Sequence, residues 1–148
     1  MSGISNGNVL RGRTAIITGA SQGLGLEIAM QYVAAGASVI ICARDEDMLS
    51  EAADVLKQSA SNDQVIFHIV ADVAESESVD TLIDFAIDKM GRIDMPVNNA
   101  GIYGPKGPID SVDWAQWVQA INVNLLGSVL MCRASSGFEV KGPELLKE

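Results

Sequence analysis

The chain has 148 residues, a length that suits one domain with a hydrophobic core of its own. Hydrophobic residues make up 48% of it and charged residues 20%, which is too apolar for a disordered chain. The sequence lacks the long apolar run that a membrane helix needs. Its net charge of -9 disfavours nucleic acids and anionic membranes as partners, because such binding depends on Lys and Arg neutralising phosphates.

The amino-terminal segment and the cysteines indicate the compartment. Residues 1–13 are polar and lack the apolar stretch of a secretory signal, so we expect a cytoplasmic protein. Cys42 lies in an apolar run and Cys132 lies late in a helical pattern, and we expect both to be buried free thiols. Neither has a partner at metal-ligand spacing, so the sequence predicts no metal site.

The predicted elements alternate along the chain. Short apolar runs rich in β-branched residues are separated by longer stretches with helical spacing, which predicts an α/β fold with a parallel sheet. We expect strands at 14–18, 38–42, 65–70 and 93–98, the first three buried on both faces. We expect helices at 23–35, 45–60, 76–90 and 111–134.

The last predicted helix has a broad apolar face. Its apolar residues recur at spacings of three and four, as on one side of a helix. They are Trp114, Trp117, Val118, Ile121, Leu125, Val129 and Cys132. The sheet and a second chain are two surfaces that could bury this face.

A glycine-rich motif joins the first strand to the first helix. It reads Thr18-Gly19-Ala20-Ser21-Gln22-Gly23-Leu24-Gly25. Gly19 can form the tight turn, Gly23 lets the backbone approach a pyrophosphate, and Gly25 lets the helix pack close to the strand. Unpaired N–H groups at the helix start favour an anion there. The alternative interpretation is a glycine-rich structural turn.

Four motifs in this order resemble the short-chain dehydrogenase/reductase family. They are the segment from Thr18 to Gly25, Asp72-Val73, Asn98-Asn99-Ala100-Gly101 and Asn124-Leu125-Leu126-Gly127. The resemblance runs from about residue 10 to residue 134. It implies a Rossmann-type doubly wound parallel sheet in which these four strands have the order 3-2-1-4. It also implies an NAD(P)-dependent oxidoreductase that transfers hydride between the cofactor and a small-molecule alcohol or carbonyl substrate.

The resemblance also implies residue roles. The cofactor pyrophosphate would contact Gly19, Ser21, Gln22, Gly23, Leu24 and Gly25, and Asp72, followed by Val73, would accept from the adenine amino group. Asn98, Ala100 and Gly101 would lie beside the adenosine ribose, and Asn124 would be the catalytic asparagine of a proton relay. From the residues alone, Asp72 could be a surface turn acid, Asn98 and Asn99 turn formers, and Asn124 a polar residue in mid-helix.

The cofactor preference is expected to depend on the end of the second strand. By the family pattern, Ala43 takes the position of an NAD-selecting acid and Arg44 follows it, which favours NADP(H) over NAD(H). Alternatively, Arg44 is a solvated arginine paired with Asp45 or Asp47. Gln22 departs from the basic residue that many NADP-dependent members carry in the glycine loop.

The family's catalytic tyrosine, with a lysine four residues later, has no match. Gly36 follows Tyr32 at that spacing and Gly107 follows Tyr103, and no residue matches the catalytic serine. We therefore expect an NAD(P)-binding domain over 1–134, a tail outside the family over 135–148, and a truncated protein that is inactive alone. The alternative is a non-catalytic dinucleotide-binding module or a partner subunit of an intact relative.

The family resemblance further implies a homo-oligomer formed through the 111–134 helix. The fourth strand would lie inside the sheet of a longer relative, but here it becomes an edge with unpaired backbone groups. Pro96 removes a backbone donor from this strand, which is tolerated on a side without a partner or at a distorted strand start.

Overall fold

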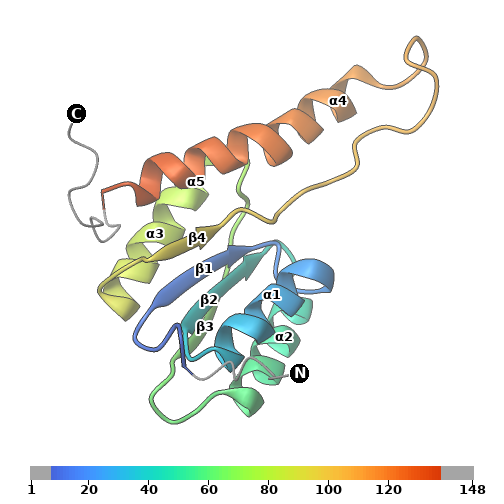
Figure 1. Ribbon diagram of the computed structural model, residues 1–148. Coiled ribbons are helices and arrows are strands. Elements are labelled where there is room, and N and C mark those ends of the chain that lie inside the picture. Colours follow the sequence, from blue (N-terminus) through green and yellow to red (C-terminus); the bar gives the residue numbers. More distant parts are fainter. Residues whose placement is uncertain (1–7, 138–148) are drawn as a thin grey trace.

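The computed structural model describes residues 8–137, which form a parallel sheet with helices on both faces (Figure 1). The strands are β1 Thr14–Thr18, β2 Ser38–Ala43, β3 Ile66–Val70 and β4 Met95–Val97. They are ordered β3-β2-β1-β4, and every neighbouring pair is parallel. The predicted fold class and the strand order 3-2-1-4 are confirmed.

The sheet separates two hydrophobic clusters, because successive strand residues point to opposite faces. Ala15 and Ile17 of β1 face the cluster beneath helices α1 (Gly23–Ala34) and α2 (Glu46–Ser59). Ile16, between them, faces the cluster beneath α3 (Ser76–Met90) and α5 (Gly127–Ser135). All of β1 is buried, as expected, but β3 is only partly buried and Val70 is 46% exposed. The prediction that β3 is buried on both faces is wrong, because β3 is an edge strand in this order.

Three helices have nearly the expected bounds. They are α1 Gly23–Ala34, α2 Glu46–Ser59 and α3 Ser76–Met90. The Asp45 carboxylate accepts a hydrogen bond from the Met48 N–H at 2.9 Å and so fixes the start of α2. Gly91, at φ +71°, ends α3 in the left-handed conformation that glycine adopts without strain.

The predicted helix at 111–134 has three consecutive parts. They are α4 Trp114–Ile121, a π-helical segment η1 Asn122–Leu126, and α5 Gly127–Ser135. We refer to the three together as the long helix. It begins three residues later than expected because the Asp113 carboxylate caps it by accepting from the Ala115 N–H at 3.0 Å. It also includes Ser135, which was expected in the tail: this side chain is buried and donates to the Met131 carbonyl at 2.8 Å.

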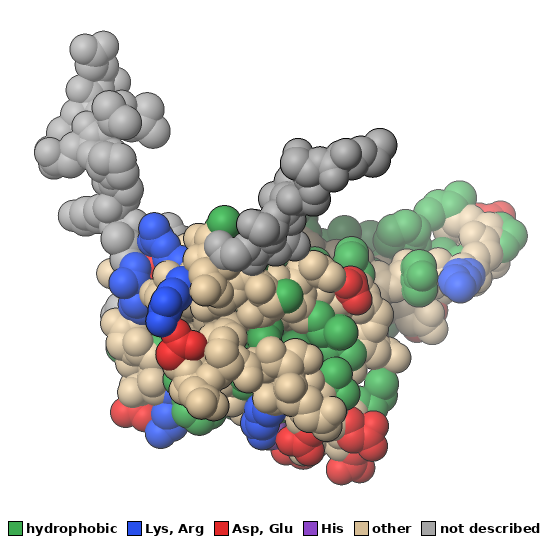
Figure 2. Space-filling model, turned by 60° about the horizontal axis from the view of Figure 1, so that its bottom comes forward, with side chains coloured by type: hydrophobic (Ala, Val, Ile, Leu, Met, Phe, Trp, Pro, Cys, Tyr) green, Lys and Arg blue, Asp and Glu red, His purple; other side chains and the backbone are tan. Residues whose placement is uncertain are grey.

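The first half of the long helix projects beyond the sheet (Figure 1). Ala120 is the only buried residue of α4, and hydrophobic side chains lie on the surface of the projecting segment (Figure 2). The large apolar residues that the whole long helix leaves exposed are Trp114, Trp117, Val118, Ile121, Leu125, Leu126 and Val129. Cys132 is also exposed, so the prediction that it is a buried thiol is wrong. The same prediction for Cys42 is confirmed. Within residues 8–137, no helix combines the length and apolarity needed to cross a membrane.

β4 is shorter than the strand expected at 93–98, and it pairs only with β1 among the described strands. Pro96 lies opposite Ile16 in this pairing. An edge strand leaves one row of backbone groups without a strand partner, which is where a proline is tolerated. The expected edge position of β4 therefore holds for the described part of the chain.

Candidate cofactor site

A groove runs along the carboxyl ends of the strands and consists of two adjoining hollows. The inner hollow has a volume of about 270 Å³ and lies between the ends of β1, β2 and β3. The outer hollow has a volume of about 540 Å³ and lies beside the start of α1 and the long helix. Five residues line both hollows, which makes them one continuous groove: Gly19, Gln22, Ala100, Gly101 and Ile102.

The glycine loop forms the wall between β1 and α1. Gly19 has φ +65° and Gly23 has φ +59°, so the loop makes its turn with backbone conformations that L side chains rarely adopt. A Cβ on Gly25 would collide with the Gly19 carbonyl oxygen, which lets α1 start close against the loop. No side chain caps α1 and its first turn has no acidic residue, so its first N–H groups, those before Leu26, are available to an anion.

Thr18 and Asn99, two residues without a predicted role of their own, connect the glycine loop to the segment after β4. The Thr18 hydroxyl accepts from the N–H groups of Asn99 and Ala100, both at 3.0 Å. The Asn99 amide donates to the carbonyl oxygens of Thr18 at 3.0 Å and Gly19 at 3.1 Å. Ala100 and Gly101, two predicted site residues, are thereby held on the floor of the groove.

Asn98 differs from its neighbours in position. Its side chain is exposed and donates to the sulfur of Cys132 at 3.5 Å, away from the two hollows. It lines neither hollow, whereas Asn99 lines the outer one. Since successive residues of an extended segment point in opposite directions, only one of the two asparagines can face the glycine loop.

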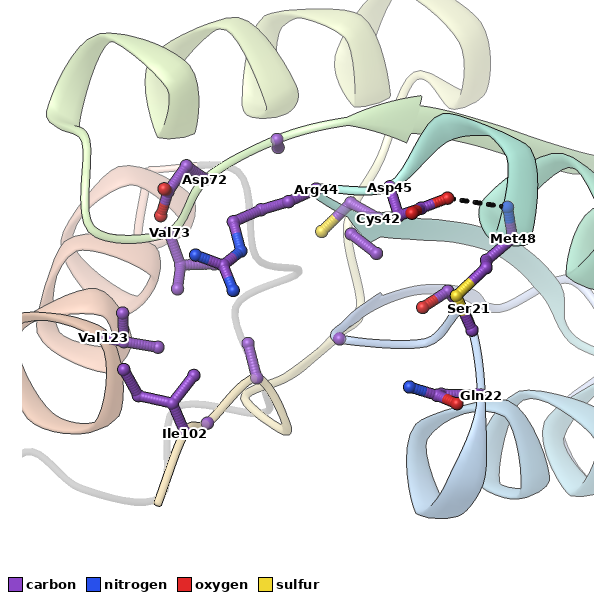
Figure 3. Close-up of a pocket in the computed structure, with 15 residues that line it drawn as sticks. Ser21, Gln22, Cys42, Arg44, Asp45, Met48, Asp72, Val73, Ile102 and Val123 are labelled. Atoms are coloured by element: carbon purple, nitrogen blue, oxygen red, sulfur yellow. Dashed lines mark hydrogen bonds between the residues drawn. The ribbon is translucent and has the colours of Figure 1, made fainter. Parts of the chain in front are cut away.

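Arg44 extends from the end of β2 into the inner hollow (Figure 3). Asp72 and Val73 lie on one side of it and Ser21 and Gln22 on the other. Within the described residues, Arg44 forms no ion pair, and Asp45 instead caps α2. The guanidinium is therefore available to an anionic ligand in this hollow.

Asp72 and Val73 form the far wall of the inner hollow, directly after β3. One carboxylate oxygen of Asp72 accepts from the Ala74 N–H at 2.9 Å, and the Asp72 N–H donates to the Ser78 hydroxyl at 2.9 Å. These bonds fix the turn and leave the second carboxylate oxygen free of hydrogen bonds within residues 8–137. Asp72 is thus a turn residue that also faces the groove.

Cys42 lies at the bottom of the inner hollow and is fully buried. Burial raises the pKa of its thiol to about 12, against a smaller lowering by a backbone hydrogen bond from Gly19. The thiol therefore stays protonated near neutral pH and acts as a small apolar side chain. Met48, Ile102 and Val123 are further apolar residues that line this hollow.

Asn124 lies in η1 and lines the outer hollow. Its side-chain amide donates to the Ile102 carbonyl and accepts from the Ile102 N–H, both at 2.8 Å. Both polar atoms of the side chain are therefore used to hold the backbone of Ile102. In this geometry the amide of Asn124 positions the groove floor.

Parallel strands, a glycine loop, an uncapped helix start and an open groove at the strand ends define a Rossmann-type α/β protein. A family model described as short chain dehydrogenase matches residues 13–141. The chain therefore belongs to the short-chain dehydrogenase/reductase family of oxidoreductases, whose members bind nicotinamide dinucleotides.

Individual relatives agree with this assignment. The chain is 38% identical over 120 residues to a chloroplastic chlorophyll(ide) b reductase of Oryza sativa subsp. japonica, covering 80% of this chain and 34% of that protein. It is 38% identical over 116 residues to the 7α-hydroxysteroid dehydrogenase of Escherichia coli K12, covering 78% and 44%. A metagenomic short-chain oxidoreductase solved with NADP superposes with a TM-score of 0.80 at 30% identity, covering 86% and 57%. The chain spans less than half the length of these two curated relatives.

Proposed function

We propose that the chain is the NADP(H)-binding part of an oxidoreductase that interconverts an alcohol and a carbonyl compound. The observation that carries this proposal is the groove, where the first N–H groups of α1 and Arg44, which forms no ion pair within residues 8–137, meet at the carboxyl ends of parallel strands. Both features attract phosphate groups. When bound, NADP(H) donates or accepts a hydride at its nicotinamide ring.

Different residues of the groove would bind different parts of the nucleotide. The glycine loop, from Gly19 to Gly25, is positioned to hold the pyrophosphate against α1. The free carboxylate oxygen of Asp72 is available to a hydrogen-bond donor such as an adenine amino group. Asn124 and Asn99 hold the intervening floor rigid through their backbone hydrogen bonds.

The preference for NADP(H) rests on Arg44. A guanidinium can form paired, charge-assisted hydrogen bonds with a 2'-phosphate, and Arg44 extends into the inner hollow, with Ser21 on the opposite side (Figure 3). Ala43 precedes it, so no acid stands where NAD-dependent relatives bind the ribose hydroxyl. The solved relative that holds NADP is a member of the same family.

Isothermal titration calorimetry tests this preference. We expect NADP⁺ to bind at least about ten-fold more tightly than NAD⁺, the effect of one charge-assisted contact to a phosphate. Arg44→Ala is expected to remove the difference by weakening NADP⁺ binding alone. Arg11→Ala, which removes an arginine paired with Asp63 outside the groove, is the matched control and keeps the preference. Equal affinities of the unmutated chain for both nucleotides would refute the preference.

A second candidate function is a non-catalytic nucleotide-binding module or a partner subunit of an intact relative. It is favoured by the absence of a Tyr-x-x-x-Lys pair from the 148 residues, since Gly36 and Gly107 follow the two tyrosines at that spacing. A general acid typically contributes about 10²- to 10⁴-fold to a rate. The remaining groove could therefore bind a nucleotide without turning over a substrate.

Activity measurements separate these candidates. We expect the purified 148-residue chain to bind NADPH in calorimetry but to consume it negligibly with a panel of carbonyl compounds. The physical reason is that the family's tyrosine with a lysine four residues later, which would exchange the proton with the substrate oxygen, has no match in the 148 residues. NADPH consumption above the chain-free background at ordinary enzyme rates would contradict this expectation and favour a complete active site.

We also propose that the chain associates with copies of itself through the 111–134 region. Trp117, Ile121 and Leu125 are among the large apolar side chains that this region leaves exposed. Residues 114–132 contain no charged residue, although the chain carries a net charge of -9. Two copies repel each other less where such uncharged surfaces meet, and a symmetric pair uses the same patch on both chains.

A further inference from the structure

The middle of the long helix has two opposite faces, and only one of them belongs to the groove. On the inner face, Val123 lines the inner hollow and Gly127 packs on Val73, which lines the same hollow. A Cβ on Gly127 would lie 2.8 Å from Val73 Cγ2, so the helix and the hollow wall touch directly. On the outer face, Leu125 and Val129 are each 55% exposed. A single helical layer thus separates the nucleotide groove from an apolar surface.

Few buried contacts hold the first half of this helix on the body. Ala120 is the only buried residue of α4 and Val123 is the only one of η1. The two hydrogen bonds between Asn124 and Ile102 add to them. Segments with few buried contacts open more easily than a core. The free energy that seats this segment is therefore small enough for a bound ligand to shift.

We propose that nucleotide binding in the groove and self-association through the outer face of the long helix strengthen each other. This inference rests on the proposed NADP(H) site, and it takes a second copy of the chain as the occupant of the outer face. A second copy is the favoured occupant because the outer face lies within residues 114–132, which carry no charge, whereas the rest of the chain is acidic. Two copies therefore repel each other least where these faces meet. The coupling follows from the direct contact of Gly127 with Val73.

The sign of the coupling follows from what each ligand does to the helix. A nucleotide that fills the inner hollow contacts a wall formed in part by Val73 and Val123, and so favours the seated helix. A second copy that covers Leu125 and Val129 favours the same seated helix from the other side. Whichever binds first has already met the cost of ordering the segment, so the other binds more tightly. By linkage, because a symmetric dimer holds two nucleotide sites, saturating both changes the dimer Kd by the square of the factor by which dimerisation changes each nucleotide affinity.

Sedimentation velocity of the full chain, with and without saturating NADP⁺, measures the coupling. We expect NADP⁺ to lower the dimer Kd by at least about five-fold, the lower end of typical coupling between sites. Leu125→Arg places a charge on the outer face and is expected to give a monomer that binds NADP⁺ more weakly by the square root of that factor, since each dimer binds two nucleotides. Val55→Arg is the matched control, since Val55 is a 42% exposed helical residue of α2 outside both faces, and it changes neither value.

Hydrogen exchange gives a readout that does not depend on association. In the Leu125→Arg monomer, we expect saturating NADP⁺ to slow the exchange of the backbone amides of residues 120–127. Unchanged exchange would contradict the shared ordering of the helix. NADP⁺ binding with an unchanged dimer Kd, or with a chain that is monomeric throughout, would overturn the coupling and leave the nucleotide site intact. Calorimetry without any NADP⁺ binding would instead contradict the proposed function.

Discussion

At the scale of single residues, Asp94 joins the starts of two strands. Its side chain is 3% exposed and accepts from the Thr14 N–H at 2.8 Å, from Arg13 at 3.2 Å and from Arg92. Burial raises the pKa of this carboxyl, but the hydrogen bonds from Arg92, Thr14 and Arg13 outweigh it and lower the pKa below its usual range. The ionised form is therefore more stable in the folded chain than in the unfolded chain.

We expect Asp94→Asn to lower the free energy of unfolding at pH 7 by about 1–3 kcal/mol, because charge-assisted hydrogen bonds are lost. A group with a lowered folded pKa contributes its stability above the unfolded pKa and loses it as the pH falls toward the folded pKa. The difference between the two chains should therefore shrink below about pH 4. Urea unfolding at several pH values measures it.

Asp63→Asn is the matched control for this experiment. It removes a carboxylate that pairs with Arg11 on the surface, where the Arg11 side chain is 67% exposed and that of Asp63 is 52% exposed. Such pairs contribute little, so this change is expected to cost less than about 1 kcal/mol. An equal effect of both substitutions would show that partial burial of Asp94 adds nothing.

At the scale of elements, the long helix differs most from its sequence pattern. Spacings of three and four predict one regular α-helix, but residues 122–126 form a π-helical turn. π-helical turns occur mostly as single insertions in α-helices and often at functional sites. In this turn Val123 faces the groove and Asn124 binds Ile102, while Leu125 and Leu126 remain exposed. Adjacent residues of this turn therefore contact the groove on one face of the helix and remain exposed on the other.

At the scale of the whole molecule, charge and apolar surface are unevenly distributed. The groove is open at the carboxyl ends of the strands, and the projecting half of the long helix carries exposed hydrophobic side chains (Figure 2). Contiguous exposed apolar surface of this kind marks interaction sites in soluble proteins. The acidic remainder of the surface opposes other contacts between copies.

Light scattering after size-exclusion chromatography tests association at this scale. At micromolar concentration we expect a mass of at least two chains, each of 15.6 kDa. Raising the salt to about 1 M should not dissociate the oligomer, because screening weakens contacts between charges but not between apolar surfaces. A monodisperse monomer at this concentration would count against self-association through the long helix.

The sequence by itself predicted the alternation of strands and helices, and the family resemblance implied the strand order, which the structure confirms. Apolar runs and glycine positions are local properties, so Gly19, Gly23 and Arg44 could be assigned before any packing was known. The short-chain dehydrogenase/reductase resemblance drawn from the motif order is confirmed by the match over residues 13–141. The NADP preference, the missing catalysis and the homo-oligomer stay predictions.

Only the tertiary structure decided which neighbouring side chains point into the site. Asn98 and Asn99 are alike in sequence, yet Asn99 binds the glycine loop while Asn98 contacts Cys132. The spacing of apolar residues did not predict the π-helical turn either. Nor did it predict the two hydrogen bonds of Asn124, because their partner, Ile102, lies 22 residues earlier in the chain. Direction and partner depend on contacts between distant segments, and a local pattern carries no information about them.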